Sequence, residues 1–555
     1  MEQSYAHGAH TSPLIGESIG AMFDRVALAA ADRDALVAVQ QGIRLSYRGL
    51  REATDRFARG LMALGVRHGD RVGIWSTNCA EWVIAQFATP KIGAILVNIN
   101  PAYRTAEASF ALQQSGVSVL LVQVRYKSSE FAQMLREVLH ELPELRTIVW
   151  IGEDAVEPPI DVSMRWGEVL ERASGVSEAA LAERLALTQF DEAINIQYTS
   201  GTTGFPKGAT LSHHNILNNG FFIGEGCRYT EADRVCVPVP FYHCFGMVLG
   251  NLAIVTHGAT IVIPNYSFDA ALTMEAVERE RCTSLYGVPT MFIAELALPN
   301  IRDYDCSTLR TGIMAGSPCP VEIMKRVQTE LHMPEVTICY GMTETAPVST
   351  QTSVDDPLEK RTRTVGHVHP HIELKIIDEE GRIVPRGTPG ELCTRGYSVM
   401  LGYWNDPENT ARAIDAARYM HTGDIAIMDS EGYVNIAGRI KDMVIRGGEN
   451  LYPREIEEFL YAHPAIEDVS VIGVPDERYG EELCAWVIVR AGMELEAETI
   501  RDFCRGKIAH HKIPRYVRFV SAFPMTITGK IQKFKMREIS TAELGLEAAA
   551  RITTA

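Results

Sequence analysis

The sequence predicts an α/β protein with a large N-terminal domain and a smaller α+β unit at the C-terminal end. From Arg71 onward, short apolar runs alternate with longer periodic stretches, a rhythm typical of βαβ units and of sheets covered by helices. After Val365 the apolar runs shorten and crowd together, which indicates a small β-subdomain. A new helix start at Pro453, followed by further strands, indicates the separate C-terminal unit.

The predicted elements of the large domain follow in chain order. Residues 1–13 are small and polar, so we expect them to fray. The first βαβ region has strands at 71–75, 95–99 and 117–122, with helices at 80–93 and 106–115. The same rhythm predicts strands at 235–239, 260–263, 283–286, 312–315 and 337–339. The β-subdomain is expected to contain the strands 373–377, 391–394, 425–428 and 434–436.

The second unit is expected to begin near Arg439. Pro453 opens a helix whose apolar residues Ile456, Phe459 and Leu460 recur at helical spacing. Strands at 469–474, 485–489 and 517–520, with a helix at 500–508, complete a small α+β domain.

Amino-acid composition and net charge exclude several classes of function. The 555 residues are 46% hydrophobic and 22% charged, which is ordinary for a globular protein of several folding units. A net charge of −17 argues against nucleic acid as the main partner. Eleven single cysteines predict reduced thiols, not disulfides or a zinc site. No apolar run of bilayer-spanning length and no targeting peptide is visible, so we expect a cytoplasmic protein. Peripheral membrane contact and homo-oligomerisation stay open.

The segment Tyr198 to Gly208 is the strongest single motif. It reads Tyr-Thr-Ser-Gly-Thr-Thr-Gly-Phe-Pro-Lys-Gly and directly follows an apolar run at 193–196. A strand that ends in such a loop offers backbone N–H groups, hydroxyls and one cation, which together can wrap a polyphosphate. The spacing differs from that of a Walker loop. The segment therefore predicts a phosphate site made of Thr199, Ser200, Gly201, Thr202, Thr203, Gly204 and Lys207.

A second motif, Tyr-Gly-Met-Thr-Glu-Thr at 340–345, follows a short apolar strand. A carboxylate beside a hydroxyl at the C-terminal edge of a strand can supply a metal ligand and a phosphate donor. The same residues also suit a capped turn from Thr343 to Ala346. The residues alone leave both explanations open.

Two shorter motifs also have a functional and a structural explanation. Ala315-Gly316-Ser317 ends a strand with small residues, which would let a flat purine approach but would also permit tight packing. Asp424, in Thr-Gly-Asp before a strand, can accept two ribose hydroxyls, although aspartate turns are common by themselves.

Two single residues are equally ambiguous. Lys530 lies in a glycine-bearing loop, where a lone lysine is usually solvated. His243 lies in Phe-Tyr-His-Cys-Phe-Gly at 241–246, where an imidazole among aromatic rings most often serves packing.

Together these motifs closely resemble those of the adenylate-forming superfamily, which contains acyl-CoA synthetases, firefly-type luciferases and peptide-synthetase adenylation domains. They occur in the family's order from about residue 90 to residue 535. Segments 208–215, 241–246 and 526–533 most resemble medium- to long-chain fatty-acid CoA ligases. The resemblance implies two half-reactions. Mg²⁺-bound ATP and a carboxylate give an acyl-adenylate and pyrophosphate, and the CoA thiolate then displaces AMP.

The resemblance also implies roles around the nucleotide. Tyr340 is implied to lie on the adenine, and Asp424 with Arg439 to hold the ribose. Thr343 is implied to donate to the α-phosphate, and Glu344 to bind Mg²⁺. The remaining implied ATP contacts are Thr199, Ser200, Gly201, Thr202, Thr203, Gly204, Lys207, Ala315, Gly316, Ser317 and Gly341.

Further implied roles concern the acid, CoA and a domain movement. Lys530 is implied to pair with the carboxylate and the α-phosphate, because a compact ammonium lowers the repulsion between two anions. His243 is implied to gate the acyl site. Lys441 is the implied hinge of a mobile C-terminal domain, with domains at 1–438 and 442–555 and the hinge at 439–441. The CoA tunnel is implied to include Arg446, Gly447 and Gly448, and the acyl pocket Gly287, Val288, Gly341 and Met342.

Three alternatives stay open. The same mechanism could act on an aryl or a short branched acid, since pocket residues decide this. An adenylation module that loads a carrier protein is disfavoured because only about 25 residues follow Lys530. A non-catalytic nucleotide-binding paralogue is disfavoured because Lys530, Glu344 and Asp424 are all present.

Overall fold

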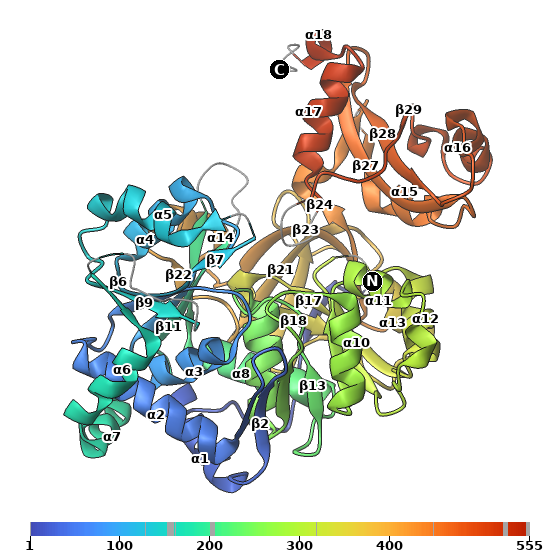
Figure 1. Cartoon of the computed structure of the whole chain (residues 1–555). Helices are drawn as coiled ribbons and strands as arrows, with labels where there is room; N and C mark the ends of the chain where they lie inside the picture. Colours follow the sequence, from blue (N-terminus) through green and yellow to red (C-terminus); the bar gives the residue numbers. More distant parts are fainter. Residues whose placement is uncertain are drawn as a thin grey trace.

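Three large sheets and the two-stranded sheet of β7 (Arg125–Tyr126) and β8 (Ser129–Glu130) belong to the large N-terminal body, and a further sheet forms a smaller unit at its C-terminal end (Figure 1). The computed structural model describes residues 2–127, 129–152, 160, 162–199, 206–317, 319–447, 449–525 and 531–550. The predicted α/β class is therefore confirmed, with a β-subdomain and a C-terminal α+β unit.

The first large sheet has eight strands in the order β10-β9-β6-β4-β5-β11-β12-β22. The strands from β10 to β11 are parallel, and β12 and β22 extend the sheet in antiparallel pairing. The strands are β4 (Arg71–Trp75), β5 (Ile95–Asn98), β6 (Val117–Gln123), β9 (Thr147–Ile151), β10 (Ser163–Arg165), β11 (Ala193–Thr199), β12 (Lys207–Ser212) and β22 (Gly402–Tyr403).

The second large sheet has nine strands in the order β19-β18-β17-β16-β15-β13-β14-β2-β3. Its strands from β17 to β2 are parallel, and the strands at both edges are antiparallel. The strands are β2 (Asp34–Ala38), β3 (Ile43–Ser46), β13 (Arg234–Cys236), β14 (Thr260–Ile263), β15 (Ser284–Gly287), β16 (Thr311–Ala315), β17 (Glu335–Gly341), β18 (Val348–Gln351) and β19 (His367–Val368).

Helices bury the apolar faces of both sheets. The largest core joins the two sheets through α1 (Ile19–Ala29), α2 (Tyr47–Ala63), α3 (Ala80–Ala88), α8 (His213–Gly226), the π-helix η4 (Phe245–Leu252) and α9 (Ala253–Thr256). The helices α4 (Thr105–Ser115) and α5 (Phe131–Val138) pack on the eight-stranded sheet. The nine-stranded sheet packs against α10 (Ala270–Arg279), α11 (Pro289–Leu296) and α12 (Val321–Glu330). The remaining α-helices described in this body are α6 (Trp166–Arg172), α7 (Glu178–Leu187), α13 (Leu358–Arg363) and α14 (Pro407–Ala413).

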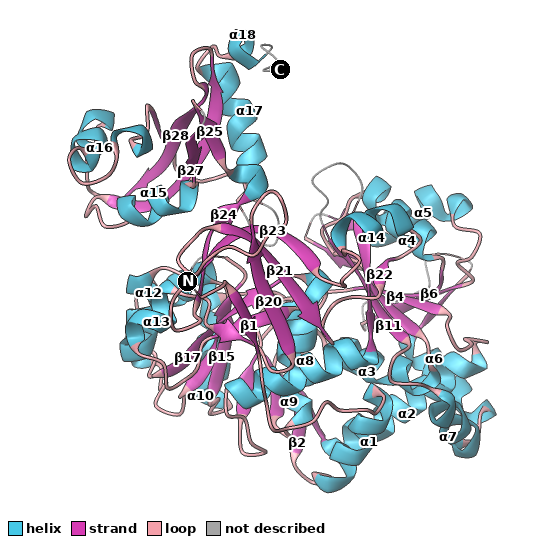
Figure 2. Ribbon diagram, turned by 180° about the vertical axis from the view of Figure 1, so that it is seen from behind, coloured by secondary structure: helices cyan, strands magenta, loops and turns pink. Residues whose placement is uncertain are grey.

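The β-subdomain is an antiparallel sheet in the order β1-β20-β21-β23-β24, which is seen well from behind (Figure 2). Its strands are β1 (Tyr5–His7), β20 (Ile372–Ile377), β21 (Gly390–Gly396), β23 (Met420–Met428) and β24 (Val434–Arg439). The expected fraying of the N-terminus is wrong, because β1 pairs with β20 at the sheet edge. The edge supplies backbone hydrogen bonds that the composition of the segment cannot reveal.

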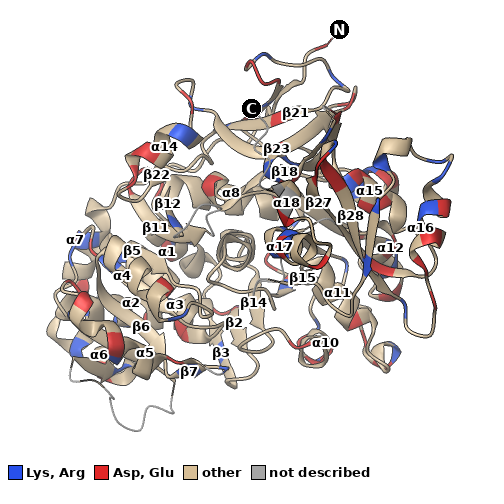
Figure 3. Ribbon diagram, turned by 90° about the horizontal axis from the view of Figure 1, so that it is seen from above, with Lys and Arg blue, Asp and Glu red and all other residues tan. Residues whose placement is uncertain are grey.

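The C-terminal unit has its own core. Its sheet is built from β25 (Val444–Arg446), β26 (Glu449–Leu451), β27 (Ile466–Asp476), β28 (Gly480–Val489) and β29 (Tyr516–Phe519). The helices α15 (Pro453–Leu460) and α16 (Ala497–Cys504) pack against it, as does α17 (Lys533–Glu543), which is followed by α18 (Glu547–Ala550). Acidic and basic residues both occur along helices such as α15 and α16 (Figure 3).

Some predicted boundaries need correction. The strands predicted at 71–75 and 260–263 are confirmed at both ends. The helix predicted at 80–93 is α3 followed by a 3₁₀ turn, Thr89–Ile92, because Pro90 cannot donate to an α-helical ladder. The strand predicted at 235–239 ends at Cys236, two residues before Pro238. No helix in the described part of the chain is long and apolar enough to cross a bilayer.

Candidate active site

The segment Tyr340 to Glu344 lies where the three sheets of the large body meet. Tyr340 and Gly341 end β17, and residues 343–345 form the 3₁₀ turn η6 (Thr343–Thr345). Tyr340 is thus the penultimate residue of the strand, not a residue after it. The predicted turn from Thr343 to Ala346 is also present, since the Ala346 N–H donates to the Thr343 carbonyl at 3.2 Å and Thr345 Oγ1 accepts from the Met342 N–H. Glu344 of this segment contacts the eight-stranded sheet, and Tyr340 contacts Asp424 of the β-subdomain.

Glu344 connects this segment to the eight-stranded sheet. Its side chain is buried, with 5% of its surface exposed. Oε1 accepts from Thr199 Oγ1 at 3.3 Å and from the Tyr403 hydroxyl at 2.9 Å. Burial, and next the nearby Glu344 carboxylate, raise the pKa of Tyr403, which keeps this phenol a hydrogen-bond donor. Among the described residues, no Lys or Arg forms an ion pair with Glu344 within 4.0 Å.

Asp424 connects the segment to the β-subdomain. Its side chain is 8% exposed. Oδ2 accepts from the Tyr340 hydroxyl at 2.6 Å, and Oδ1 lies 3.0 Å from Nε of Arg439, the last residue of β24. Burial, followed by the Asp424 charge, raises the pKa of Tyr340 well above its usual value. Asp424 lies within β23, not before it, so the predicted strand start at 425 is corrected to Met420.

The small residues after β16 lie at the surface of the site. Ala315 is buried, whereas Gly316 and Ser317 are exposed. Gly316 has a φ of +92°, which favours glycine. A Cβ there would lie 3.2 Å from Cγ1 of Val288, one of the predicted acyl-pocket residues. The exposure of the pair means that tight packing does not account for these two small residues.

Of the predicted acid-site residues, Gly341 and Met342 belong to this segment, whereas Gly287 and His243 come from other parts of the chain. Gly287 ends β15, and the space beside it is filled by the ring of Phe292. The Met342 N–H donates to the Pro347 carbonyl at 2.9 Å, and the same carbonyl would be 1.7 Å from a Cβ on Gly341. The His243 ring lies 4.4 Å from the Tyr242 ring. Burial raises the pKa of the neighbouring Cys244 thiol, and nearby Glu344 adds to the rise.

Three described residues of the predicted hinge and CoA tunnel follow β24 in the chain. Lys441 belongs to the 3₁₀ turn η7 (Ile440–Asp442), which joins β24 to β25. Arg446 pairs with the buried Glu482 at 2.7 Å and lies over the Tyr479 ring. Gly447 has a φ of +59°, and its N–H donates to the Tyr479 carbonyl.

Sequence reasoning missed two contributors to the site. The hydroxyl of Tyr403, on β22, donates to Glu344. The Nζ of Lys207 lies 5.2 Å from the centroid of the Tyr403 ring. Gln197, buried on β11, accepts from Cys244 Sγ at 3.2 Å. The sequence holds no signal for either contact, because each depends on the packing of distant segments.

Comparison with known proteins identifies the family. A family model described as AMP-binding enzyme matches residues 23–404, and one described as AMP-binding enzyme C-terminal domain matches residues 455–530. The chain belongs to the AMP-binding enzyme family. The predicted resemblance to adenylate-forming enzymes is thereby confirmed.

Relatives of this AMP-binding enzyme share nearly its full length. A Bacillus subtilis (strain 168) protein, YngI, named as an acyl-CoA synthetase, is 47% identical over 540 residues, covering 95% of this chain and 97% of that protein. The medium-chain acyl-CoA ligase ACSF2, mitochondrial, of Danio rerio is 43% identical over 562 residues, covering 98% and 92%. The crystal structure of the anthranilate CoA ligase AuaEII in complex with anthranoyl-AMP superposes with a TM-score of 0.85 at 28% identity, covering 96% and 99%.

Some predicted site residues of this AMP-binding enzyme lie outside the described residues. These are Ser200, Gly201, Thr202, Thr203, Gly204, Gly448 and Lys530. Their roles stay predictions.

Proposed function

We propose that the protein is an AMP-forming acyl-CoA synthetase that joins a medium-chain fatty acid to CoA. The observation that carries this proposal is that two buried carboxylates, those of Glu344 and Asp424, are held at the segment 340–344. Asp424 accepts from Tyr340, and Glu344 accepts from Thr199, the last residue of the strand that leads into the glycine-rich loop. The full-length similarity to proteins named acyl-CoA synthetase and medium-chain acyl-CoA ligase supports it.

These residues would have different roles in the two half-reactions. In the first, a carboxylate oxygen of the acid bonds to the α-phosphorus of ATP, and the bond to pyrophosphate breaks. Asp424, Arg439 and Tyr340 would hold the ribose and adenine, and Thr343 would donate to the α-phosphate. Lys530 would lower the repulsion between the two anions. In the second, the CoA thiolate bonds to the acyl carbon, and AMP leaves.

The chemistry of Glu344 fits a magnesium ion. A buried carboxylate without a described cationic partner, flanked by hydroxyl oxygens, is the hard oxygen donor set that Mg²⁺ prefers. When bound, the ion would neutralise charge on the phosphates of ATP. Thr199 and Tyr403 would orient the Glu344 carboxylate toward it.

The movement between the half-reactions is also part of the proposal. We assign the domains to 1–438 and 442–555, with residues 439–441 as the hinge and Lys441 at its centre. The position of Lys441 in a short turn between two separate sheets supports this assignment. Arg446, Gly447 and Gly448 would then line the CoA tunnel after rotation.

The acid is proposed to be an unbranched alkyl carboxylate. Gly287, Val288, Gly341 and Met342 offer no charged group for a polar tail, and each buried methylene adds about 0.8 kcal/mol, so affinity should rise to roughly six to twelve carbons. His243 would stand beside the acid carboxylate. A cytoplasmic location fits the eleven free cysteines, since such thiols persist in reducing compartments.

An acid panel tests this function. AMP release that depends on CoA would be measured with the purified full chain, from acetate to palmitate and with benzoate. We expect kcat/KM to rise with chain length and then to level off or fall. A maximum at acetate, or benzoate exceeding every alkyl acid, would contradict the proposed substrate. No AMP release with any acid would contradict the proposed reaction.

A further inference from the structure

The strand that carries Asp424 is irregular on both sides. Its pairing with β21 passes from Cys393↔His421 directly to Glu391↔Ile425, so one residue of β21 faces residues 422–424 of β23. Its pairing with β24 shifts between Ile425 and Ala426. Such bulges redirect a side chain, but they also leave backbone groups without a ladder partner. Other groups must therefore hold the bulge in shape.

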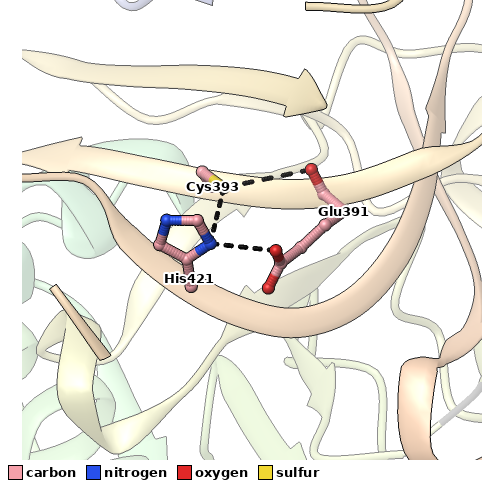
Figure 4. A group of neighbouring side chains, drawn as sticks. All are labelled: Glu391, Cys393 and His421. Atoms are coloured by element: carbon pink, nitrogen blue, oxygen red, sulfur yellow. Dashed lines mark hydrogen bonds and ion pairs between the residues drawn. The ribbon is translucent and has the colours of Figure 1, made fainter. Parts of the chain in front are cut away.

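Glu391 supplies these contacts from the neighbouring strand. Its Oε1 accepts from the Gly423 N–H at 3.1 Å. Its Oε2 lies 2.9 Å from Nδ1 of His421, a contact drawn in Figure 4. One carboxylate thus spans residues 421–423, directly before Asp424. Gly423 has a φ of +68°, so the turn depends on a backbone conformation that other residues rarely adopt.

Thr422 closes the same turn from its other side. Its hydroxyl donates to the Leu392 carbonyl at 2.7 Å and accepts from the Asp424 N–H at 3.1 Å. Side chains therefore accept from the N–H groups of Gly423 and Asp424, and the Asp424 side chain leaves the bulge toward Tyr340 and Arg439.

We propose that Glu391 is a positioning residue, whose carboxylate fixes the turn at 421–423 and so aims Asp424 at the ribose hydroxyls of ATP. This inference rests on the ribose role of Asp424 in the proposed function. Glu391 itself would contact no substrate. It would affect ATP binding only by fixing the backbone of β23 that carries Asp424.

A metal site is the competing explanation for the same cluster. One ligand atom each of Glu391, Cys393 and His421 lie within 4.8 Å of one another. However, zinc binds the thiolate, and burial raises the pKa of Cys393 to about 12, so a zinc ion would have to displace this proton. Both Glu391 oxygens already have partners. His421 also faces Asp415, whose Oδ2 lies 3.8 Å from Nε2, and Asp415 pairs in turn with Lys375.

The test compares binding of ATP with binding of 2′,3′-dideoxy-ATP, which lacks both ribose hydroxyls. Dissociation constants would be measured by calorimetry on the full chain. We expect the wild type to prefer ATP, and Glu391→Ala to weaken ATP about tenfold while leaving dideoxy-ATP nearly unchanged, the size of one hydrogen bond to a charged group. The preference should thus largely disappear, because the two changes remove the same interaction.

Matched variants separate positioning from folding. Glu391→Gln should keep most of the preference, since its amide oxygen can still accept from the Gly423 N–H. Thr422→Val should reduce the preference as Glu391→Ala does. Glu373→Ala makes the same chemical change as Glu391→Ala in the same sheet, where Glu373 pairs with Arg395, and should bind both nucleotides as the wild type does.

Three results would overturn the inference. Glu391→Ala could retain the preference for ATP, or it could weaken both nucleotides equally. Alternatively, purified wild type could hold one equivalent of zinc whose removal by a chelator abolishes the preference. These results leave acid activation intact as a separate question, because AMP release from the acid panel tests that function independently.

Discussion

Glu344 and Asp424 are both almost fully buried, yet the structure compensates their charges differently. Asp424 has a resident cation, since Arg439 lies 3.0 Å away at a position that is 53% exposed. Glu344 accepts only from two hydroxyls, and in the described part of the chain it has no ion pair with Lys or Arg. A buried carboxylate without a cation is costly. This difference matches the proposed roles, in which Asp424 holds the ribose hydroxyls and Glu344 binds the Mg²⁺ that arrives with ATP.

Replacing Glu344 should have the largest effect. Glu344→Gln removes the charge that would hold Mg²⁺ but keeps acceptors for Thr199 and Tyr403. We expect acid-dependent pyrophosphate exchange to fall about 10²- to 10³-fold, the loss typical of a group that stabilises transition-state charge. The rate would be measured over a range of Mg²⁺ concentrations. An unchanged dependence on Mg²⁺ would mean that the two carboxylates do not differ as proposed.

Replacing Asp424 should have a smaller effect that appears in binding. Asp424→Asn keeps the size of the side chain but weakens its hydrogen bonds to hydroxyls. Because a hydrogen bond to a charged group contributes about 1.5–3 kcal/mol, the dissociation constant of ATP should rise roughly ten- to a hundredfold. Calorimetry without acid measures this directly. An unchanged ATP affinity would remove Asp424 from the ribose site.

The Tyr340–Asp424 contact should be visible in alkaline stability. The pKa of Tyr340 is raised above 10.0 in the folded protein, first by burial and then by Asp424. The folded state therefore holds this proton more tightly, so its contribution is complete below about pH 10 and is lost as pH rises above it. The stability difference between wild type and Tyr340→Phe should shrink above pH 10 in denaturant titrations. A difference that is constant up to pH 11.5 would contradict the buried Tyr340–Asp424 contact.

Replacing Tyr403 should have the smallest effect. Tyr403→Phe removes one of two hydroxyls that orient Glu344 but keeps the ring beside Lys207. We expect pyrophosphate exchange to fall about three- to tenfold, since one hydrogen bond contributes about 1 kcal/mol and a charged acceptor somewhat more. A loss as large as that of Glu344→Gln would show that Tyr403 does more than orient the carboxylate.

The sequence determined the elements and the motifs of this protein. The strands at 71–75 and 260–263 were predictable because buried parallel strands are continuous apolar runs. The motifs around Thr199, Tyr340 and Asp424 were recognisable because each concentrates polar groups at a strand end within a few residues. These signals are local in the chain, so no knowledge of packing is needed to detect them.

Only the tertiary structure decided which of these groups meet. Tyr403 reaches Glu344 across 59 residues of sequence, and Glu391 reaches Gly423 across 32. The strand at Tyr5–His7 and the bulge around Asp424 likewise depend on partner strands hundreds or tens of residues away. Such contacts follow from sheet order and register, which a single sequence does not encode in any local pattern. The sequence therefore predicted which chemical groups the site contains, and the packing of three sheets determined how these groups are arranged.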